Sequence, residues 1–137
     1  MSANSIKAIL LITLSLLLAA SDYGNATKVR VKNDLEEGQI LTLSCSYYIA
    51  DNTKTATVTG VLSGDQVKEL SLDPNTTTTI DCSFKWGSSS YLFLLYSEYR
   101  DSPYCVPECT WSIKQDRPCR VDPNNSQIKY YCDSWIN

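Results

Sequence analysis

The cysteines are the side chains with the most chemistry to offer in this 137-residue chain. There are six of them: Cys45, Cys82, Cys105, Cys109, Cys119 and Cys132. An even number of cysteines implies a disulfide framework when a chain is secreted, and the first residues of this chain predict secretion. A zinc site built from the last four is the alternative. Zinc sites use tighter spacings, and this chain has no histidine, so disulfides are favoured. Six cysteines allow on the order of 15 pairings, and the sequence does not choose among them.

Catalytic groups are sparse. Without histidine, neither a Ser–His nor a Cys–His pair can form. There is no Gly-rich phosphate loop and no metal-ligand motif, so no cofactor is expected. Glu36 and Glu37 could serve as paired glycosidase carboxylates. They are adjacent in a turn, where a solvated acidic surface is the favoured interpretation. The sequence gives no basis for an enzyme.

The first 21 residues resemble a secretory signal peptide. Lys7 precedes an apolar run over residues 8–20, and Ala19, Ala20 and Ser21 offer small residues for cleavage. A membrane anchor is the alternative, but the run of about 13 residues is shorter than the roughly 20 needed to cross a bilayer. The sequence therefore predicts a signal peptide over residues 1–21, and a secreted, extracellular domain over residues 22–137 that does not insert into membranes.

Charge and sequons describe the surface of this domain. The formal net charge of −3 for the whole chain, which includes Lys7 of the predicted signal peptide, argues against nucleic acid or an anionic membrane as a partner, because both reward concentrated positive charge. Three Asn-x-Ser/Thr sequons fall in predicted loops or near the start of the secreted domain, at Asn25, Asn75 and Asn124. We expect at least one to be glycosylated.

The clearest strand spans residues 78–86. Apolar or small side chains alternate with polar ones, at Thr78, Ile80, Cys82, Phe84 and Trp86. A period of two predicts a half-buried antiparallel strand, and it favours core packing over a ligand groove for these aromatics. Residues 109–114 repeat the pattern, with Cys109, Trp111 and Ile113 inward, and are expected to form a partner strand.

Other segments predict further strands, at residues 28–32, 41–47, 55–62, 67–72 and 128–132. Residues 91–96 are apolar throughout, which predicts a strand covered on both faces. Turn residues separate the runs at intervals of about 8 to 12 residues. No helix pattern appears in the secreted domain. The sequence therefore predicts an all-β fold, a single-domain antiparallel β-sandwich stapled by disulfides.

Several segments, taken in order, resemble the plant self-incompatibility protein S1 family, also called S-protein homologues. They are residues 29–35 (VRVKNDL), 41–45 (LTLSC), 82–86 (CSFKW), 99–101 (YRD), 109–113 (CTWSI) and Cys119. The resemblance covers nearly all of the secreted domain. It implies a small secreted β-sandwich with intramolecular disulfides. In poppy, members secreted by the stigma are ligands of a pollen receptor, so the resemblance also implies a receptor protein as partner.

The loop over residues 99–104 is the best candidate for recognition. It is charged, contains two tyrosines and a proline, and ends at Cys105, whose disulfide would limit its conformations. Its candidate contact residues are Arg100, Asp101, Ser102 and Tyr104. The alternative is structural, with Arg100 and Asp101 capping a turn.

Three function classes follow from these observations. The favoured one is a monomeric secreted signalling ligand, either a self-incompatibility determinant or a divergent homologue, which a cell-surface receptor recognises through surface loops. The second is a secreted defence or enzyme-inhibitor protein without catalytic activity. The third is a carbohydrate-active wall protein.

Overall fold

The structure is a computed structural model that describes residues 27–105, 107–122 and 129–135. The predicted signal peptide and two of the sequons, Asn25 and Asn124, lie outside the described residues. Within the described part, no helix is long and apolar enough to cross a membrane.

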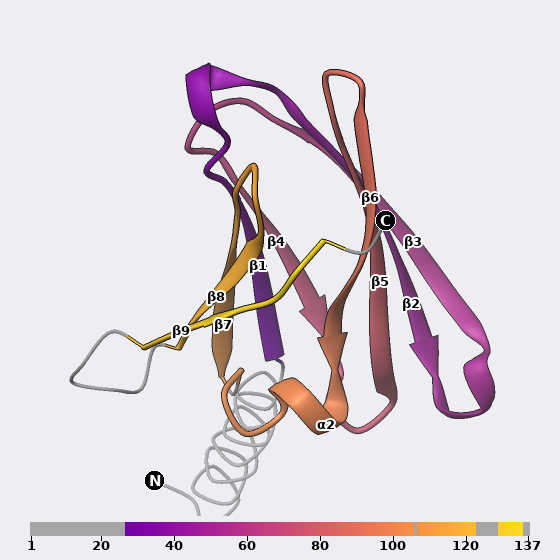
Figure 1. Ribbon diagram of the computed structural model, residues 1–137. Helices are drawn as coiled ribbons and strands as arrows, with labels where there is room; N and C mark the ends of the chain where they lie inside the picture. The colour runs from indigo at the N-terminus through magenta and orange to yellow at the C-terminus, as the bar shows by residue number, and fades with distance from the viewer. Residues whose placement is uncertain (1–26, 106, 123–128, 136–137) are drawn as a thin grey trace, which may run out of the picture.

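Two β-sheets face each other across a common core (Figure 1). One sheet has five strands in the order β4-β1-β7-β8-β9, and the other has four in the order β3-β2-β5-β6. The strands are β1 (Thr27–Asn33), β2 (Leu41–Ile49), β3 (Lys54–Leu62), β4 (Val67–Leu72), β5 (Thr77–Trp86), β6 (Ser89–Ser97), β7 (Glu108–Ile113), β8 (Pro118–Asp122) and β9 (Lys129–Cys132). The predicted all-β sandwich is confirmed.

The pairing of strands differs from the expectation in one respect. β5 pairs with β2 and β6, antiparallel on both sides, as expected for the clearest strand. Its expected partner β7 instead lies in the other sheet, between β1 and β8. β7 runs parallel to β1, with Val29 opposite Cys109 and Val31 opposite Trp111. Periodicity identifies the buried face of a strand but not the sheet that holds it.

The buried faces of β5 and β7 follow the predicted alternation, except that Thr77 rather than Thr78 is buried at the start of β5. In β5, Ile80, Cys82, Phe84 and Trp86 are buried. In β7, Cys109, Trp111 and Ile113 are buried in the same way. These residues belong to a single apolar cluster between the sheets, so the large aromatics act as core.

β6 was expected to be covered on both faces, and this is wrong. It forms an edge of the four-stranded sheet, and Leu92 on its outer face is 70% exposed. A register shift in the pairing of β5 with β6 leaves Leu95 without a direct partner in β5. Because such a bulge changes the alternation, both Leu95 and the following Tyr96 are buried.

Two further elements escape the sequence patterns. The helix α2 (Glu98–Asp101) is a single turn that follows β6 at one end of the sandwich (Figure 1). It is too short to show helical periodicity. The strand β8 begins with a proline and places a charged residue, Arg120, at a buried position, so it lacks the apolar signal of a strand.

All six cysteines form disulfides, as predicted, and the structure gives the pairing. Cys45 pairs with Cys82, Cys105 with Cys109, and Cys119 with Cys132. The first and third bridges join residues directly opposite each other on neighbouring antiparallel strands. The bridge between Cys105 and Cys109 instead connects the segment after α2 to the second residue of β7.

The end of the described chain connects the two sheets. Residues 133–135 leave β9 and cross toward the four-stranded sheet (Figure 1). The ring of Trp135 packs against four aromatic rings on that sheet, with distances of 5.1 to 5.9 Å between ring centroids. These are the rings of Phe84, Trp86, Tyr91 and Phe93. Its indole N–H donates to the carbonyl of Lys114 at 3.3 Å, just after β7. Trp135 is thus a partly buried residue that packs against the edge of the core.

Removing one disulfide at a time, by replacing both of its cysteines with alanine, should destabilise the fold by an amount that depends on which bridge is removed. The bridges close segments with sequence separations of 37, 13 and 4 residues, for the Cys45, Cys119 and Cys105 bridges respectively. Chain entropy in the unfolded state then predicts losses of about 4, 3 and 2 kcal/mol in the free energy of unfolding. Denaturant titration of the three variants measures this order. The largest loss at the Cys105 bridge would contradict it.

Candidate functional site

Two exposed tyrosines mark the segment after β6. We call residues 98–104 the tyrosine loop. Tyr99 is 97% exposed, which is the largest value among the exposed large hydrophobic residues described, and Tyr104 is 48% exposed. Pro103 is exposed between them, and Ser102 is partly exposed. A surface of this kind, with aromatic rings held on a rigid base, is typical of protein recognition.

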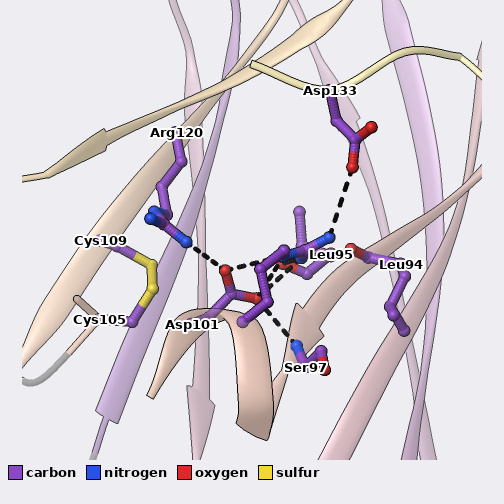
Figure 2. A network of polar contacts seen from close by, with 9 residues as sticks. Leu94, Leu95, Ser97, Asp101, Cys105, Cys109, Arg120 and Asp133 are labelled. Atoms are coloured by element: carbon purple, nitrogen blue, oxygen red, sulfur yellow. Dashed lines mark hydrogen bonds and ion pairs between the residues drawn. A yellow bond between two sulfur atoms is a disulfide. The ribbon is translucent and has the colours of Figure 1, made fainter. Parts of the chain in front are cut away.

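Beneath these tyrosines, Asp101 lies in the interior with a relative exposure of 0%. Its carboxylate accepts hydrogen bonds from the backbone N–H of Ser97 at 2.8 Å and from Nη2 of Arg100 at 2.7 Å. It also forms an ion pair with Arg120, which is 2% exposed and comes from β8 in the other sheet. Figure 2 shows the carboxylate between these groups. Asp101 therefore joins the loop to both sheets.

Arg100 fixes the adjacent end of β6. Its Nη2 donates to the carbonyl oxygens of Leu94 at 2.6 Å and Leu95 at 3.1 Å, where the bulge interrupts the strand pairing. On the opposite side, the carboxylate of Asp133 lies 3.8 Å from Nη1 (Figure 2). Two guanidinium groups and two carboxylates thus balance each other in charge, and the two members that are fully buried, Asp101 and Arg120, pair with each other.

Aromatic rings surround both guanidinium groups. The Cζ atom of Arg120 lies 4.7 Å from the ring centroid of Tyr104 and 5.0 Å from that of Tyr131. The Cζ atom of Arg100 lies 4.9 Å from the ring of Trp111 and 5.3 Å from that of Phe93. Cation–π attraction is strengthened where water is excluded. The exposed ring of Tyr104 is therefore held in place by a buried cation.

Backbone contacts and a disulfide complete the base of the loop. The N–H groups of Tyr104 and Cys105 both donate to the carbonyl of Asp101, at 2.9 and 2.8 Å. The bridge from Cys105 to Cys109 then fixes the end of the loop to β7. Both sulfur-bearing residues are buried, so the bridge belongs to the core.

The structure divides the predicted recognition residues into two groups. The contact role expected for Asp101 is corrected, because its carboxylate is fully buried and bonded within the protein. Arg100 is directed to the strand β6 and to two carboxylates, so the turn-capping alternative describes both residues. Ser102 and Tyr104 remain accessible. Tyr99 and Arg120 were not among the candidates. The exposure of Tyr99 has no sequence signal, and Arg120 fell in no predicted strand.

The remaining candidates lie elsewhere. Asn75 is exposed in the turn between β4 and β5, where its backbone N–H donates to the Asp73 carboxylate at 2.9 Å. Glu36 and Glu37 are exposed in a short turn, as expected. Within the described residues, no cluster of three or more ligand-type side chains is placed to hold a metal.

One titratable group responds to the buried network. Tyr96 is 1% exposed and lies at the end of β6 next to the tyrosine loop. Burial, together with the negative charges of Asp101 and Glu98, raises the pKa of its phenol above the ordinary value. The neutral phenol is therefore the form that this end of the sandwich accommodates.

Replacing Asp101 with asparagine should be strongly destabilising. The variant keeps the shape of the side chain but leaves the charge of Arg120 buried beside a neutral amide. We expect the free energy of unfolding to fall by about 3 to 5 kcal/mol, measured by denaturant titration.

Glu69→Gln is the matched control, because Glu69 also pairs with two cations, Lys28 and Arg30, but is 41% exposed at its side chain. Exposed pairs of this kind contribute about 0 to 1 kcal/mol each, so this variant should stay close to the parent protein. Equal losses in the two variants would show that burial does not set the strength of the Asp101 network.

Comparison with known proteins identifies the family of this chain. The model of the plant self-incompatibility protein S1 family matches residues 28–135. S-protein homolog 5 of Arabidopsis thaliana is 43% identical over 44 residues, which are 32% of this chain and 34% of that protein. S-protein homolog 2 of the same plant is 34% identical over 58 residues, 39% of this chain and 35% of that protein. The chain thus spans about a third of the length of these curated relatives. Because the family match runs from β1 to Trp135, the chain belongs to the plant self-incompatibility protein S1 family.

Proposed function

We propose that this S-protein homologue is a secreted signalling ligand that a cell-surface receptor protein recognises through the tyrosine loop. Proteins of the S1 family are non-catalytic signalling proteins. One observation carries the proposal. Tyr99 and Tyr104 are exposed on a loop whose base is fixed by the buried Asp101 and by the Cys105–Cys109 bridge.

The physical reason is the cost of ordering a binding surface. A mobile loop loses conformational entropy when it binds, and this loss reduces affinity. Here the network around Asp101 orders the base of the loop before any partner arrives. Tyrosine adds a large contact area with few rotatable bonds, which favours its use at the centre of an interface. In this proposal Arg100 and Asp101 act as positioning residues, and Tyr99, Ser102 and Tyr104 contact the receptor.

Secretion and glycosylation are part of the same proposal. Three disulfides fit an oxidising compartment, and the sequon at Asn75 lies in an exposed turn. Expression of the full chain in plant cells should yield protein in the medium whose mass falls after treatment with a peptide N-glycosidase. Asn75→Gln should remove one glycan and leave secretion intact. Retention inside the cell, or an unchanged glycan mass in the Asn75→Gln variant, would contradict this prediction.

The tyrosine loop should control binding to receptor-bearing membranes. Labelled protein should bind saturably to plasma-membrane vesicles from reproductive tissue. A Tyr99→Ala/Tyr104→Ala variant should bind at least about 30-fold more weakly, since each anchoring aromatic side chain contributes about 1 to 2 kcal/mol or more. Its melting temperature should fall by only a few degrees. Tyr99 is 97% exposed and has little packing to lose, and Tyr104 loses its ring contact with Arg120, which contributes about 1 kcal/mol.

Ile40→Ala and Val61→Ala serve as controls, because these side chains are 56% and 66% exposed and lie outside the loop. Both should bind like the parent protein. Equal weakening in all the variants would reject the tyrosine loop as the contact surface. If the protein does not bind membranes but inhibits a protease or a glycosidase saturably, and the tyrosine variant does not, the inhibitor function would be favoured instead.

A further inference from the structure

A shallow groove of about 580 Å³ lies on the outer face of the four-stranded sheet, away from the core. Its lining includes six side chains from β2, β5 and β6, namely Ser44, Ser46, Tyr48, Asp81, Ser83 and Leu92. We call it the serine groove. Its size falls within the range of pockets that hold small ligands. The tyrosine loop contributes no residue to this lining.

The floor of the serine groove is rigid. Ser44 lies opposite Ser83, and Ser46 lies opposite Asp81, in the pairing of β2 with β5. Between these two pairs, the strands are joined on their inner face by the disulfide of Cys45 with Cys82. The covalent link fixes the register of the strands that carry the groove. Ligand groups meeting this surface therefore encounter polar atoms that are already in position.

The lining combines a few polar groups with apolar surface, as a sugar-binding site does. Three serine hydroxyls can each donate and accept a hydrogen bond. The carboxylate of Asp81 is exposed and forms no ion pair or side-chain hydrogen bond with the described residues, so it offers acceptor oxygens. The side chain of Leu92, 70% exposed, and the partly buried ring of Tyr48 provide apolar contact at the same surface. A sugar ring combines hydroxyl groups at its rim with apolar C–H faces, and so matches both kinds of group.

Charge narrows the class of ligand. The one charged side chain in the lining is acidic, so an anionic ligand would meet repulsion from Asp81. A neutral sugar instead can donate two hydroxyl protons to the carboxylate, and hydrogen bonds to a charged acceptor are the stronger kind. We propose that the serine groove binds a neutral oligosaccharide, with Asp81 accepting hydrogen bonds from its hydroxyls and Leu92 and Tyr48 packing against a ring face. This site is independent of receptor recognition through the tyrosine loop.

Purified full-length secreted protein tests the proposal without any receptor. The probes are cellohexaose, xylohexaose and mannohexaose as neutral chains, and hexagalacturonate as an acidic chain of equal length. Titration followed by amide chemical shifts should show saturable binding of at least one neutral chain, with shifts centred on β2, β5 and β6. Asp81→Asn should weaken that binding about tenfold or more. The acidic chain should bind the parent protein more weakly than the neutral one.

Matched variants separate the groove from general effects. Ser83→Ala inside the groove should weaken binding, whereas Ser90→Ala, an exposed serine of β6 outside the lining, should not. Glu69→Gln, on the other sheet, controls for the loss of a surface carboxylate. The proposal is overturned if no neutral chain saturates at up to about 5 mM, which corresponds to very weak binding. It is also overturned if hexagalacturonate binds as tightly, or if folded Asp81→Asn and Ser83→Ala both bind like the parent protein.

Discussion

The ion pair between Asp101 and Arg120 is the interaction on which one end of this molecule depends. A carboxylate or a guanidinium group that is removed from water without a partner costs several kcal/mol. Asp101 and Arg120 can lie in the interior because they pair with each other, and Arg100 and the backbone N–H of Ser97 stabilise the Asp101 carboxylate further. Since Arg120 comes from β8 and Asp101 follows β6, their pairing also fixes the two sheets relative to each other. The loop above them takes its conformation from this constraint.

Much of the fold could be predicted from the alternation of side chains, because the apolar residues at every second position of β2, β5 and β7 are the ones that are buried. The periodicity of a strand does not predict which other strands it pairs with. The parallel pairing of β1 with β7 and the edge position of β6 depend on contacts between distant segments. The strand β8 was not predicted, because it has the charged Arg120 at a buried position where a strand pattern requires an apolar residue. The same arginine is part of the candidate site.

The sequence selected the candidate segment, but it did not reveal which of its side chains are buried and which are exposed. Charged residues beside a cysteine indicated the segment, and the tyrosine loop lies there. A charged side chain in a sequence, however, gives no sign of whether water or an opposite charge will surround it. Arg100 and Asp101 form an ion pair with each other, and Arg100 also donates hydrogen bonds to the backbone of β6. The exposed surface of the loop is therefore formed by the tyrosines beside them. In this fold the aromatic residues divide in the same way, with Trp111 buried and Tyr99 exposed.

The parallel pairing of β1 with β7 also bears on how the chain folds as it is made. Strands β2, β3, β5 and β6 form their sheet from residues 41–97, and neighbours in that sheet are antiparallel and mostly close in sequence. The β1 strand is synthesised first, yet its partner β7 does not exist until residue 113 has been added. Non-local pairing of this kind is slow, because a long loop must close before any contact is gained. During synthesis β1 has only β4 to pair with until β7 is made, and the ring contacts of Trp135 form last, at the end of the described chain.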